Sequence, residues 1–350
     1  MDARIEIIEA ENADVSQLAV LFDEAYGPGK RRFLMEHGDW VHRGPGNRWV
    51  ALVDGAVAGY RGIIPATCML GGEVLPAVWA MNLYVLREFR GRGLQRLLDQ
   101  RVRDAAAEVR MSFPGEVGAA IYEKQGYSLR QDLAEWRLPL SPIAYWRERS
   151  GTGLSLTARR ALLSARVAAR QFRARNYRTR RTELVDSPDL RVLEDVFHRH
   201  ADPSQVTTLR DAAFLGWRYQ AAPYSRELLF YVTSLRGRPT HYAVVRHTAV
   251  SSAPARVLDL FGDFDDEEGL DDLLRTIVRD AIHRDRDHAS ILVSSPRLES
   301  AARGVNFHRF NQYRFRWSAT DPQVDARISQ AGLYWVLGDS DNDFQAASFR

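Results

Sequence analysis

With 350 residues, the chain is about twice as long as a typical single domain, so its length favours two domains. Apolar residues make up 45% of it and charged residues 27%, which is ordinary for globular proteins and excludes disordered, collagen-like and coiled-coil classes. The net charge of +3, from 48 basic and 45 acidic residues, is too small to indicate a protein that coats nucleic acid.

The single cysteine and the N-terminal sequence indicate a cytoplasmic protein. Cys68 has no partner for an internal disulfide and belongs to no cysteine cluster of the kind that holds a metal. Residues 1–6 lack the basic and apolar stretches of a signal peptide, and no apolar run approaches the roughly 18 residues of a membrane span. We therefore expect neither a membrane span nor a metal site.

The first 86 residues predict a strand, a helix and then three further strands. Apolar residues recur at helical spacing over residues 12–26, whereas the polar stretch around residues 37–42 is expected to form a loop. The pair Asp54–Gly55 is typical of a hairpin turn. Residues 78–86 form an apolar run of strand length, as in a central strand buried on both faces. The strands predicted here are 4–9, 48–53, 57–70 and 78–86.

A glycine loop, residues 90–95, follows the central strand. Its sequence is Arg-Gly-Arg-Gly-Leu-Gln, and an amphipathic helix begins within it. Glycines let the backbone turn sharply, while free N–H groups and the dipole at a helix N-terminus attract anions; Arg90 and Arg92 add full positive charges. The loop lacks the Gly-Lys-Ser/Thr of a Walker loop and the three spaced glycines of a dinucleotide fingerprint. It therefore predicts a pyrophosphate site of another kind.

Residues 109–138 complete the pattern of the first half. We expect a strand over residues 109–113, a helix over residues 116–125 that ends at Gly126, and a last strand over residues 128–138. Within them, residues 120–127 read Ala-Ile-Tyr-Glu-Lys-Gln-Gly-Tyr.

These two motifs together resemble those of the GCN5-related N-acetyltransferase (GNAT) superfamily. Residues 90–95 are similar to its Arg/Gln-x-x-Gly-x-Gly/Ala acetyl-CoA loop, and residues 122–127 are similar to its Tyr-Glu-Lys-x-Gly-Phe segment. The resemblance covers most of residues 4–138, in the right order and spacing. It implies an α/β (α+β) fold in which a mixed, mostly antiparallel central sheet is flanked by helices.

The resemblance also implies how acetyl-CoA, or another acyl-CoA, would be held as co-substrate. Backbone groups of residues 83–85 would hold the pantetheine arm in a gap between strands, and the glycine loop would bind the pyrophosphate. Gln95 stands where the family has Gly or Ala, and its side chain would narrow the space beside the phosphates. The cofactor-binding residues implied in this way are Leu83, Tyr84, Val85, Arg90, Gly91, Arg92, Gly93, Leu94 and Gln95.

By the same resemblance, Tyr122 would be the catalytic acid. Acyl transfer from a thioester to an amine releases a thiolate, which leaves more readily when it is protonated. A phenol of ordinary pKa about 10 donates to a thiolate whose conjugate acid lies near 8.5 only with help from geometry. The alternative is that Tyr122 only packs its ring within a helix.

The sequence leaves the general base open. An alkyl ammonium with a pKa near 10 must lose a proton before it attacks a thioester. Asn82, in the central strand, would orient a water molecule or would only satisfy backbone groups. His37, Asp39 and His42 lie in the region that forms the acceptor-side wall in the family, and each is a candidate base beside the alternative of a solvated side chain.

Residues 141–182 are predicted to link two domains. Their first part contains Pro142, Gly151 and Gly153, and residues 157–182 then hold nine arginines and no acidic residue. A basic helix of this kind suits an acidic membrane surface, RNA or a phosphorylated substrate. The alternative is a linker helix whose arginines are solvated or paired with acidic loops. The predicted division is a GNAT domain over 1–140, a linker over 141–182 and a second domain over 183–350.

From residue 183 the order of elements repeats that of the first half, which predicts a second, degenerate GNAT-like domain. Its Trp217 and Arg218 are expected to contact an acceptor or to pack at a domain seam. An acidic loop, residues 262–269, stands where the first half has its glycine loop, and five of its eight residues are acidic. Because such a loop would repel a pyrophosphate, we expect no CoA binding there. The acidic residues 339–343 are expected to be solvated or to line an amine site.

These features predict an acyl-CoA-dependent N-acyltransferase, in the first instance an N-acetyltransferase. Its acceptor would be the amine of a small molecule such as an amino sugar, an amino acid or a natural product. One alternative is a Fem-like aminoacyl transferase that uses tRNA, although such enzymes generally lack a working CoA loop. Another is a non-catalytic CoA-binding or scaffold protein. A nucleic-acid partner is not expected, but the Arg-rich segment leaves it open, and the oligomeric state is not predicted.

Overall fold

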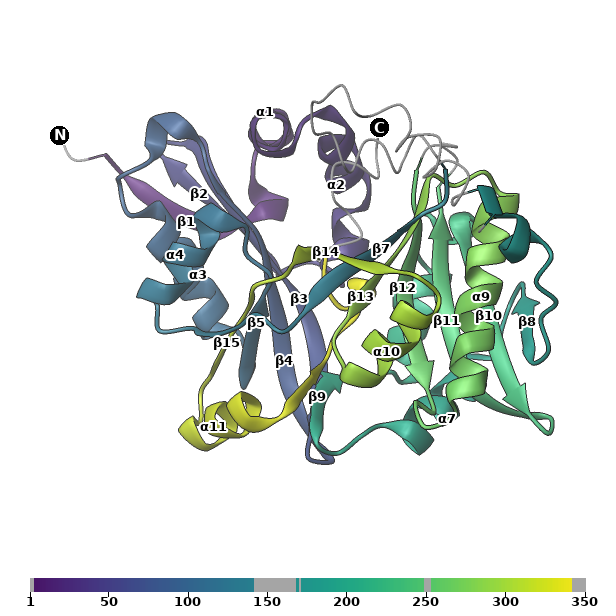
Figure 1. Cartoon of the computed structure of the whole chain (residues 1–350). Helices are drawn as coiled ribbons and strands as arrows, with labels where there is room; N and C mark the ends of the chain where they lie inside the picture. Colours follow the sequence, from purple (N-terminus) through teal and green to yellow (C-terminus); the bar gives the residue numbers. More distant parts are fainter. Residues whose placement is uncertain (1–2, 142–167, 170, 249–252, 342–350) are drawn as a thin grey trace, which may run out of the picture.

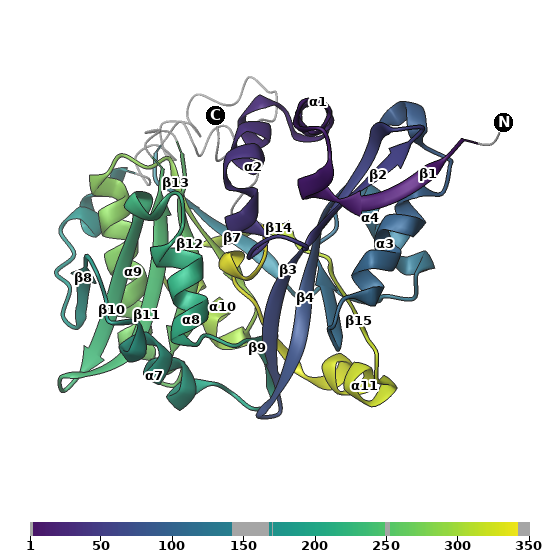
Figure 2. The same cartoon turned by 180° about the vertical axis from the view of Figure 1, so that it is seen from behind.

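The computed structural model describes residues 3–141, 168–169, 171–248 and 253–341. Two β-sheets lie side by side, and each has helices packed against it (Figure 1 and Figure 2).

The first sheet has nine strands, most of them from the N-terminal half of the chain. Its main path runs in the order β1 (Ile5–Glu9), β2 (Arg48–Val53), β3 (Ala56–Leu70), β4 (Glu73–Val85), β5 (Val109–Ser112), β15 (Phe315–Ala319) and β6 (Ser128–Arg130). Beside this path, β9 (Gln205–Thr208) pairs with β3, and β16 (Gly332–Tyr334) pairs with β9. The pairs β4–β5 and β9–β16 are parallel, and the other neighbours are antiparallel.

The second sheet has seven strands, most of them from the C-terminal half. Their order is β14 (His308–Gln312), β7 (Ala134–Pro139), β13 (His288–Val293), β12 (Ala255–Gly262), β11 (Arg238–His247), β10 (Leu228–Leu235) and β8 (Thr182–Val185). Here only the pair β12–β13 is parallel among the described strands. Both sheets are thus mixed and mostly antiparallel, and the predicted fold class is confirmed.

Each sheet includes a strand from the other half of the chain that lies between two of its own strands. β15 lies between β5 and β6 in the first sheet, and β7 lies between β13 and β14 in the second. Figure 1 shows this exchange as a yellow strand in the purple and blue lobe and a blue-green strand among green and yellow ones. The single strand predicted over residues 128–138 is wrong, because β6 and β7 belong to different sheets. The two sheets therefore do not separate at the predicted linker, and the domain division stays a prediction.

Helices cover both sheets. Those of the first lobe are α1 (Val15–Tyr26), α2 (Pro28–Val41), α3 (Leu94–Asp104), α4 (Glu116–Lys124) and α11 (Pro322–Gln330), and those of the second are α7 (Leu190–His200), α8 (Ala212–Leu215), α9 (Glu267–His283) and α10 (Pro296–Gly304). The loop predicted around residues 37–42 is wrong, because α2 continues to Val41 with a kink at His37. Pro28 suits the first turn of this helix, and Phe33, Leu34 and Val41 bury its inner face.

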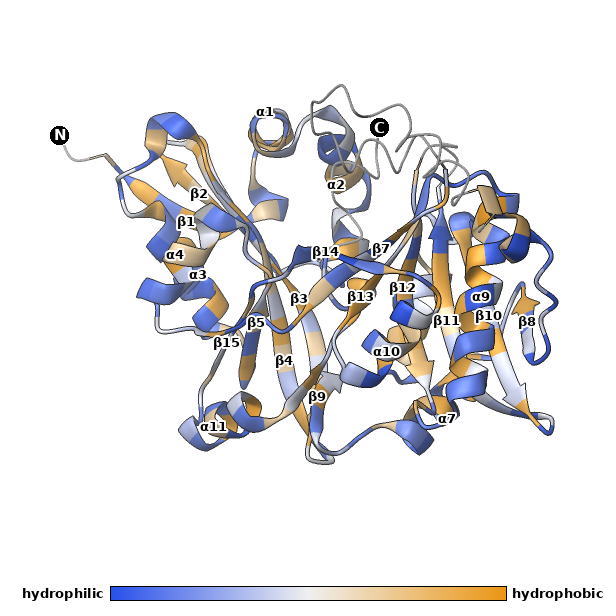
Figure 3. Ribbon diagram, viewed as in Figure 1, coloured by the Kyte–Doolittle hydropathy of each residue, from blue (hydrophilic) through white to orange (hydrophobic). Residues whose placement is uncertain are grey.

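One hydrophobic core joins the two halves. It contains Trp79 and Met111 from the first half and Val196 and Trp335 from the second. Figure 3 shows hydrophobic residues along the strands of both sheets and hydrophilic stretches on the helices that flank them. Because apolar burial is the main source of stability, the two halves stabilise each other.

Across the described ranges, no helix is long and apolar enough to cross a membrane. In the same ranges, no group of three or more His, Cys, Asp or Glu side chains could hold a metal ion.

Most of the predicted Arg-rich linker, residues 142–167 and 170, lies outside the described residues. Its C-terminal end docks on α9. The backbone N–H groups of Arg180 and Arg181 donate to Asp272 at 3.0 and 3.1 Å, and the Tyr177 hydroxyl donates to the same carboxylate at 2.6 Å. The Arg181 side chain forms an ion pair with Asp266. At least this arginine is paired with the acidic loop.

Candidate functional site

A β-bulge in β4 shapes the centre of the first sheet. Tyr60 of β3 is opposite Tyr84, but Gly62 is opposite Met81, so that two residues of β4 face one residue of β3. Asn82, inside the bulge, has φ +55°, a left-handed conformation that Asn adopts more readily than most residues. A bulge bends its strand and disturbs the ladder, so the end of β4 turns away from the sheet plane.

β4 and β5 separate shortly before the bulge. They pair in parallel only from Ala77 to Trp79 and from Val109 to Met111, whereas β4 continues to Val85. Along the described chain, the last residues of β4 therefore have no strand partner on the β5 side. Close to the point of separation, the hydroxyl of Ser112 donates to the carbonyl of Ala80 at 3.0 Å.

The glycine loop leads from β4 into α3 with an open helix N-terminus. Gly91 and Gly93 have φ values of +81° and +76°, which L side chains rarely adopt. Gly93 is the N-cap residue of α3, so no side chain accepts from the first N–H groups of the helix. The Arg90 guanidinium donates to the carbonyl of Val85 at 3.1 Å. An uncapped helix N-terminus beside an arginine is a site where an anion is stabilised.

These elements border a cavity of about 720 Å³, which we call the β4–β5 cavity. Its volume lies within the range of roughly 300–1,000 Å³ of small-molecule sites. Of the predicted cofactor-binding residues, it is lined by Leu83, Tyr84, Val85, Arg90, Gly91, Gly93, Leu94 and Gln95. Arg92 does not line it, and its guanidinium instead lies 5.4 Å from the centre of the Phe89 ring. Both predicted catalytic residues, Tyr122 and Asn82, also lie in the wall.

A buried arginine fixes the position of Tyr122. The Arg61 guanidinium donates to the Tyr122 hydroxyl oxygen at 2.6 Å and lies 3.1 Å from a carboxylate oxygen of Asp99. Burial alone would lower the pKa of Arg61, but Tyr122 and Asp99 outweigh it and leave that pKa raised. Because Arg61 already occupies a lone pair of the phenol oxygen, the phenolic hydrogen is free to donate to another acceptor.

Arg61 and Asp99 were not among the site residues predicted from the sequence. A charged residue inside a strand of mostly apolar residues was the available signal, because charged side chains are rarely buried unless they are paired. Asp99 also accepts hydrogen bonds from the amides of Gln95 and Gln125. The side chain of Gln95 is therefore engaged by Asp99, one turn further along α3.

Asn82 places an unused donor at the bulge. The residue is 9% exposed, and its Nδ2 has no hydrogen-bond partner within the described structure. Buried polar groups are normally paired, so this amide group is available to a ligand or a water molecule.

None of the three candidate bases from α2 and its end lines the β4–β5 cavity. His42 is fully buried, with Nδ1 at 2.8 Å from the carbonyl of Ile63 and Nε2 at 3.1 Å from the Tyr60 hydroxyl. Burial lowers the pKa of His42 to about 3, so it is neutral and both of its nitrogens are engaged. Asp39 is exposed and paired with an arginine, and His37 lies at the surface. The expectation that one of them acts on the acceptor is therefore not supported by their positions.

Acidic residues near the C-terminus enter the site instead. The expectation that residues 339–343 are solvated is wrong for Asp339, which is fully buried and paired with Arg210 at 3.1 Å. Arg210 also pairs with the buried Asp259 at 3.0 Å. Asp341 lines the β4–β5 cavity, where it lies 3.6 Å from Nζ of Lys30.

Arg218 holds the same C-terminal segment. It is 1% exposed and donates to the carbonyl groups of Gly338 and Ser340 at 2.6 and 2.9 Å. Its neighbour Trp217 exchanges hydrogen bonds with Trp40 of α2, each indole N–H donating to the other residue's carbonyl. Of the two expectations for Trp217 and Arg218, the position at the seam between the halves is the one observed.

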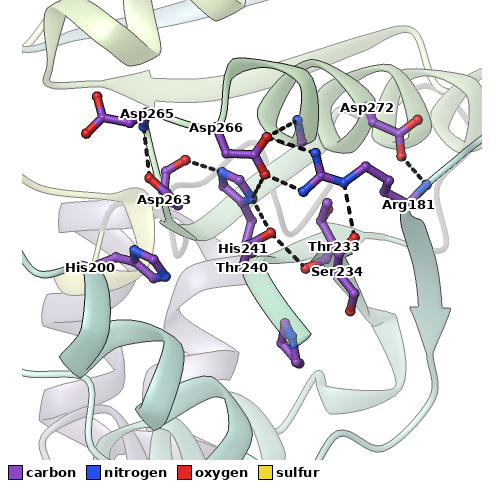
Figure 4. A network of polar contacts seen from close by, with 12 residues as sticks. Arg181, His200, Thr233, Ser234, Thr240, His241, Asp263, Asp265, Asp266 and Asp272 are labelled. Atoms are coloured by element: carbon purple, nitrogen blue, oxygen red, sulfur yellow. Dashed lines mark hydrogen bonds and ion pairs between the residues drawn. The ribbon is translucent and has the colours of Figure 1, made fainter. Parts of the chain in front are cut away.

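The acidic loop closes the corresponding position of the second sheet (Figure 4). Asp266 caps α9 by accepting from the N–H of Gly269 at 3.1 Å, and Arg181 pairs with the same carboxylate. Nε2 of the buried His241 lies 2.6 Å from the carbonyl of Asp263. Burial lowers the pKa of His241 to about 4. A protein carboxylate and its arginine thus occupy this helix N-terminus.

No family model matches the sequence, and no curated protein matches it either. Solved structures with a similar fold do exist. Saccharomyces cerevisiae N-myristoyltransferase with bound myristoyl-CoA gives a TM-score of 0.63 at 14% identity, covering 91% of this chain and 83% of that one. A probable N-acyltransferase of unknown function from Enterococcus faecalis V583 gives 0.58 at 12% identity, covering 93% and 74%.

A GCN5-related N-acetyltransferase from Anabaena variabilis ATCC 29413 gives a TM-score of 0.58 at 16% identity, covering 91% of this chain and 73% of that one. The chain therefore has the tandem GNAT fold found in N-myristoyltransferase. At these identities the likeness concerns the fold, and the predicted resemblance is confirmed at that level.

Proposed function

We propose, from the premise of the tandem GNAT fold, that this protein is an acyl-CoA-dependent N-acyltransferase acting on the amine of a small molecule. The observation that carries the proposal is the separation of β4 from β5, which opens into the β4–β5 cavity beside an uncapped helix N-terminus. Structures of the same fold include an N-myristoyltransferase with bound myristoyl-CoA and a probable N-acyltransferase, which supports a transferase.

The unpaired groups of the cavity fit an acyl-CoA. The end of β4 at Leu83–Val85 has no strand partner toward β5 in the described chain, although Arg90 already donates to the Val85 carbonyl. It suits the amide groups of a pantetheine arm, because such an arm can hydrogen-bond as a strand would. The glycine loop and the N-terminus of α3 suit a pyrophosphate, and Arg90 adds positive charge. Acyl-CoA supplies a thioester that is already activated toward amines.

Tyr122 is the proton donor in this proposal. When the bond between the carbonyl carbon and the sulfur breaks, Tyr122 gives its phenolic proton to the sulfur. Arg61, which remains within hydrogen-bond distance of the phenol oxygen, then stabilises the phenolate. Asp99 keeps the guanidinium in place, so Arg61 and Asp99 are positioning residues and only Tyr122 acts on the reacting atoms.

The test of CoA binding is isothermal titration of acetyl-CoA into the full chain and into Arg90→Glu. Reversing the charge replaces an attraction with a repulsion, so we expect the affinity to fall at least tenfold, which corresponds to about 1.4 kcal/mol or more. Arg309→Glu, an exposed position on β14 of the other sheet, makes the same change in net charge and serves as the control. Undiminished binding by Arg90→Glu would remove the glycine loop from the proposal.

A further inference from the structure

The β4–β5 cavity contains an ion pair that the proposed CoA-binding residues do not use. Nζ of Lys30 lies 3.6 Å from Oδ2 of Asp341, and the two side chains are 9% and 26% exposed. Lys30 comes from the first turn of α2, whereas Asp341 comes from the C-terminal segment. Nζ also lies 4.5 Å from the centre of the Tyr26 ring. A cation and an anion from opposite halves of the chain thus meet in the wall of the site.

This ion pair and other groups in the wall of the same cavity have unused hydrogen-bonding capacity. The separation of 3.6 Å exceeds the roughly 2.7–2.9 Å of a charge-assisted hydrogen bond, so the pair is not hydrogen-bonded. Oη of Tyr26 and Nδ2 of Asn82, both of cavity-lining residues, are buried without a partner in the described ranges. Since buried polar groups are normally paired, this set of groups indicates a polar ligand.

We infer, building on the proposed function, that Lys30 and Asp341 form the acceptor subsite and that the acceptor is a zwitterion, an amino acid with a free amine and a free carboxylate. The ammonium group would replace Lys30 as the partner of Asp341. The carboxylate would replace Asp341 as the partner of Lys30.

Charge balance selects this class of acceptor. With a zwitterion bound, Lys30, Asp341 and the ligand sum to zero, and each charge has an opposite partner. With a simple amine bound, the ammonium group would take Asp341 and leave the buried Lys30 unpaired. A buried charge that loses its partner is strongly destabilising, so simple amines and amino-acid amides would bind more weakly.

The same arrangement supplies the proton acceptor that the sequence left open. Asp341 takes one proton from the ammonium group, which frees the nitrogen lone pair to form the bond to the acyl carbon. The carbon–sulfur bond breaks, and the sulfur receives the proton of Tyr122. The second amine proton leaves to solvent as the amide forms, and the proton on Asp341 and the proton needed by Tyr122 are exchanged with solvent before the next cycle.

The second half of the chain positions Asp341 in this arrangement. Arg218 binds the carbonyl groups of Gly338 and Ser340, and Arg210 binds the side chain of Asp339, so the segment is fixed up to the residue before Asp341. Arg210 and Arg218 are therefore positioning residues for Asp341. The second sheet thereby contributes to acceptor binding without holding acyl-CoA.

The experiment compares acids with their amides. Thiol release is measured with acetyl-CoA, octanoyl-CoA and myristoyl-CoA as donors, and with the twenty amino acids, each beside its carboxamide. The full chain, Lys30→Met and the control Lys124→Met are assayed; Lys124 is the only other lysine and is exposed on α4. Titration with acetyl-CoA and a thermal unfolding scan accompany each variant.

We expect the wild type to prefer the best amino acid over its amide at least tenfold in kcat/KM. Lys30→Met should bring this ratio close to one while the Kd for acetyl-CoA changes less than twofold, and Lys124→Met should leave both unchanged. Equal use of acid and amide by the wild type, whose folding is not in question, overturns the inference, as does a preference that survives in Lys30→Met. If no amino acid reacts or raises the Tm of the CoA-loaded protein, the inference also fails. Failure to bind any acyl-CoA would instead remove the proposed function itself.

Discussion

The glycine loop and the acidic loop occupy equivalent places in the two sheets. Each connects the first strand of a parallel pair to the helix that crosses to the second: β4 to α3 in one sheet and β12 to α9 in the other. The helix dipole is the same in both, and the difference lies in what occupies the helix N-terminus. Gly93 leaves that of α3 open, whereas Asp266 caps that of α9 and is itself neutralised by Arg181. At the N-terminus of α9, the carboxylate of one side chain, Asp266, thus takes the place that a bound anion would have.

The gaps between the parallel strands also differ: the one in the first sheet opens into a cavity, and the one in the second sheet is filled by the protein itself. β12 and β13 pair only at Ala255–Arg256 and Ala289–Ser290, much as β4 and β5 pair over a short stretch. In the second sheet the chain itself fills the space, because the Tyr334 hydroxyl donates to the carbonyl of Leu260. Strand separation alone therefore does not make a binding site. The backbone groups that it frees must also be left unused by the protein's own side chains.

Tyr122→Phe gives the largest effect expected from this contrast. α10, the counterpart of α4 in the second lobe, contains no tyrosine, so the proposed acid has no substitute there. Loss of a general acid typically costs about 10²–10⁴-fold in rate, and we expect the turnover number to fall at least 100-fold with the Kd for acetyl-CoA changed less than twofold. Tyr127→Phe, whose ring packs on Tyr122 with 4.8 Å between centroids, is the matched control in the thiol-release assay. An unchanged turnover in Tyr122→Phe would retire the acid role.

His241→Gln tests whether the stability of the folded protein around the acidic loop depends on a neutral His241. Burial lowers the pKa of His241 to about 4, so the unfolded chain binds a proton in the range from about 6.5 to 4 that the folded chain does not. Stability contributed by this group is therefore present above pH 6.5 and is lost as the pH falls, by about 2 kcal/mol at pH 5. His241 faces Asp263, Asp266 and Arg181.

We measure the free energy of unfolding by urea at pH 7.5 and pH 5. Gln keeps a donor in the place of Nε2 but does not titrate, so the variant should lose about 2 kcal/mol less than the wild type between these two pH values. If the free energy of unfolding falls equally in both proteins between these pH values, burial does not lower the pKa of His241 as stated here.

Asp266→Ala is expected to change the free energy of unfolding the least. It tests the comparison of the acidic loop with the glycine loop most directly. The variant loses the cap of α9 and the partner of Arg181, so the free energy of unfolding should fall by about 1–2 kcal/mol. Titration should still show one acetyl-CoA per chain in both proteins, because the gap in the second sheet stays filled. Asp189→Ala, which removes the cap of α7 away from the acidic loop, is the control for a capping loss alone. Two molecules bound by the wild type would contradict the contrast between the loops.

Local signals in the sequence predicted the parts of the site that lie on one continuous segment. The glycine loop, the helix after it and the helix that carries Tyr122 could be found because turn chemistry, apolar spacing and two motifs all lie within residues 78–127. Arg61 and Asp99 could not be matched to Tyr122, since a strand and two helices bring them together only in the folded chain. The same holds for Lys30 and Asp341, which are far apart in the sequence.

The exchanged strands show a second limit of sequence reasoning. Residues 128–138 were predicted to form one strand, and their sequence does not reveal that β6 and β7 enter different sheets. The composition of residues 339–343 also does not show that Asp339 is buried, because its partner, Arg210, lies far away in the sequence. Pairing partners distant in sequence are set by the packing of the halves and not by local propensity.

The exchange of β7 and β15 also governs when the protein can become complete during synthesis. The side chain of Arg110, in β5, donates to the hydroxyl of Thr320, 210 residues further along the chain, so this part of the first sheet is complete only after the second half has been made. Contacts of such long range slow folding and leave strand edges exposed in the meantime. On the ribosome, the N-terminal half would emerge with an unfilled position beside β5, and the cavity that it borders would receive Asp341 only after much of the second half had been made. The β4–β5 cavity would thus be complete only after both halves of the described chain had been synthesised and packed together.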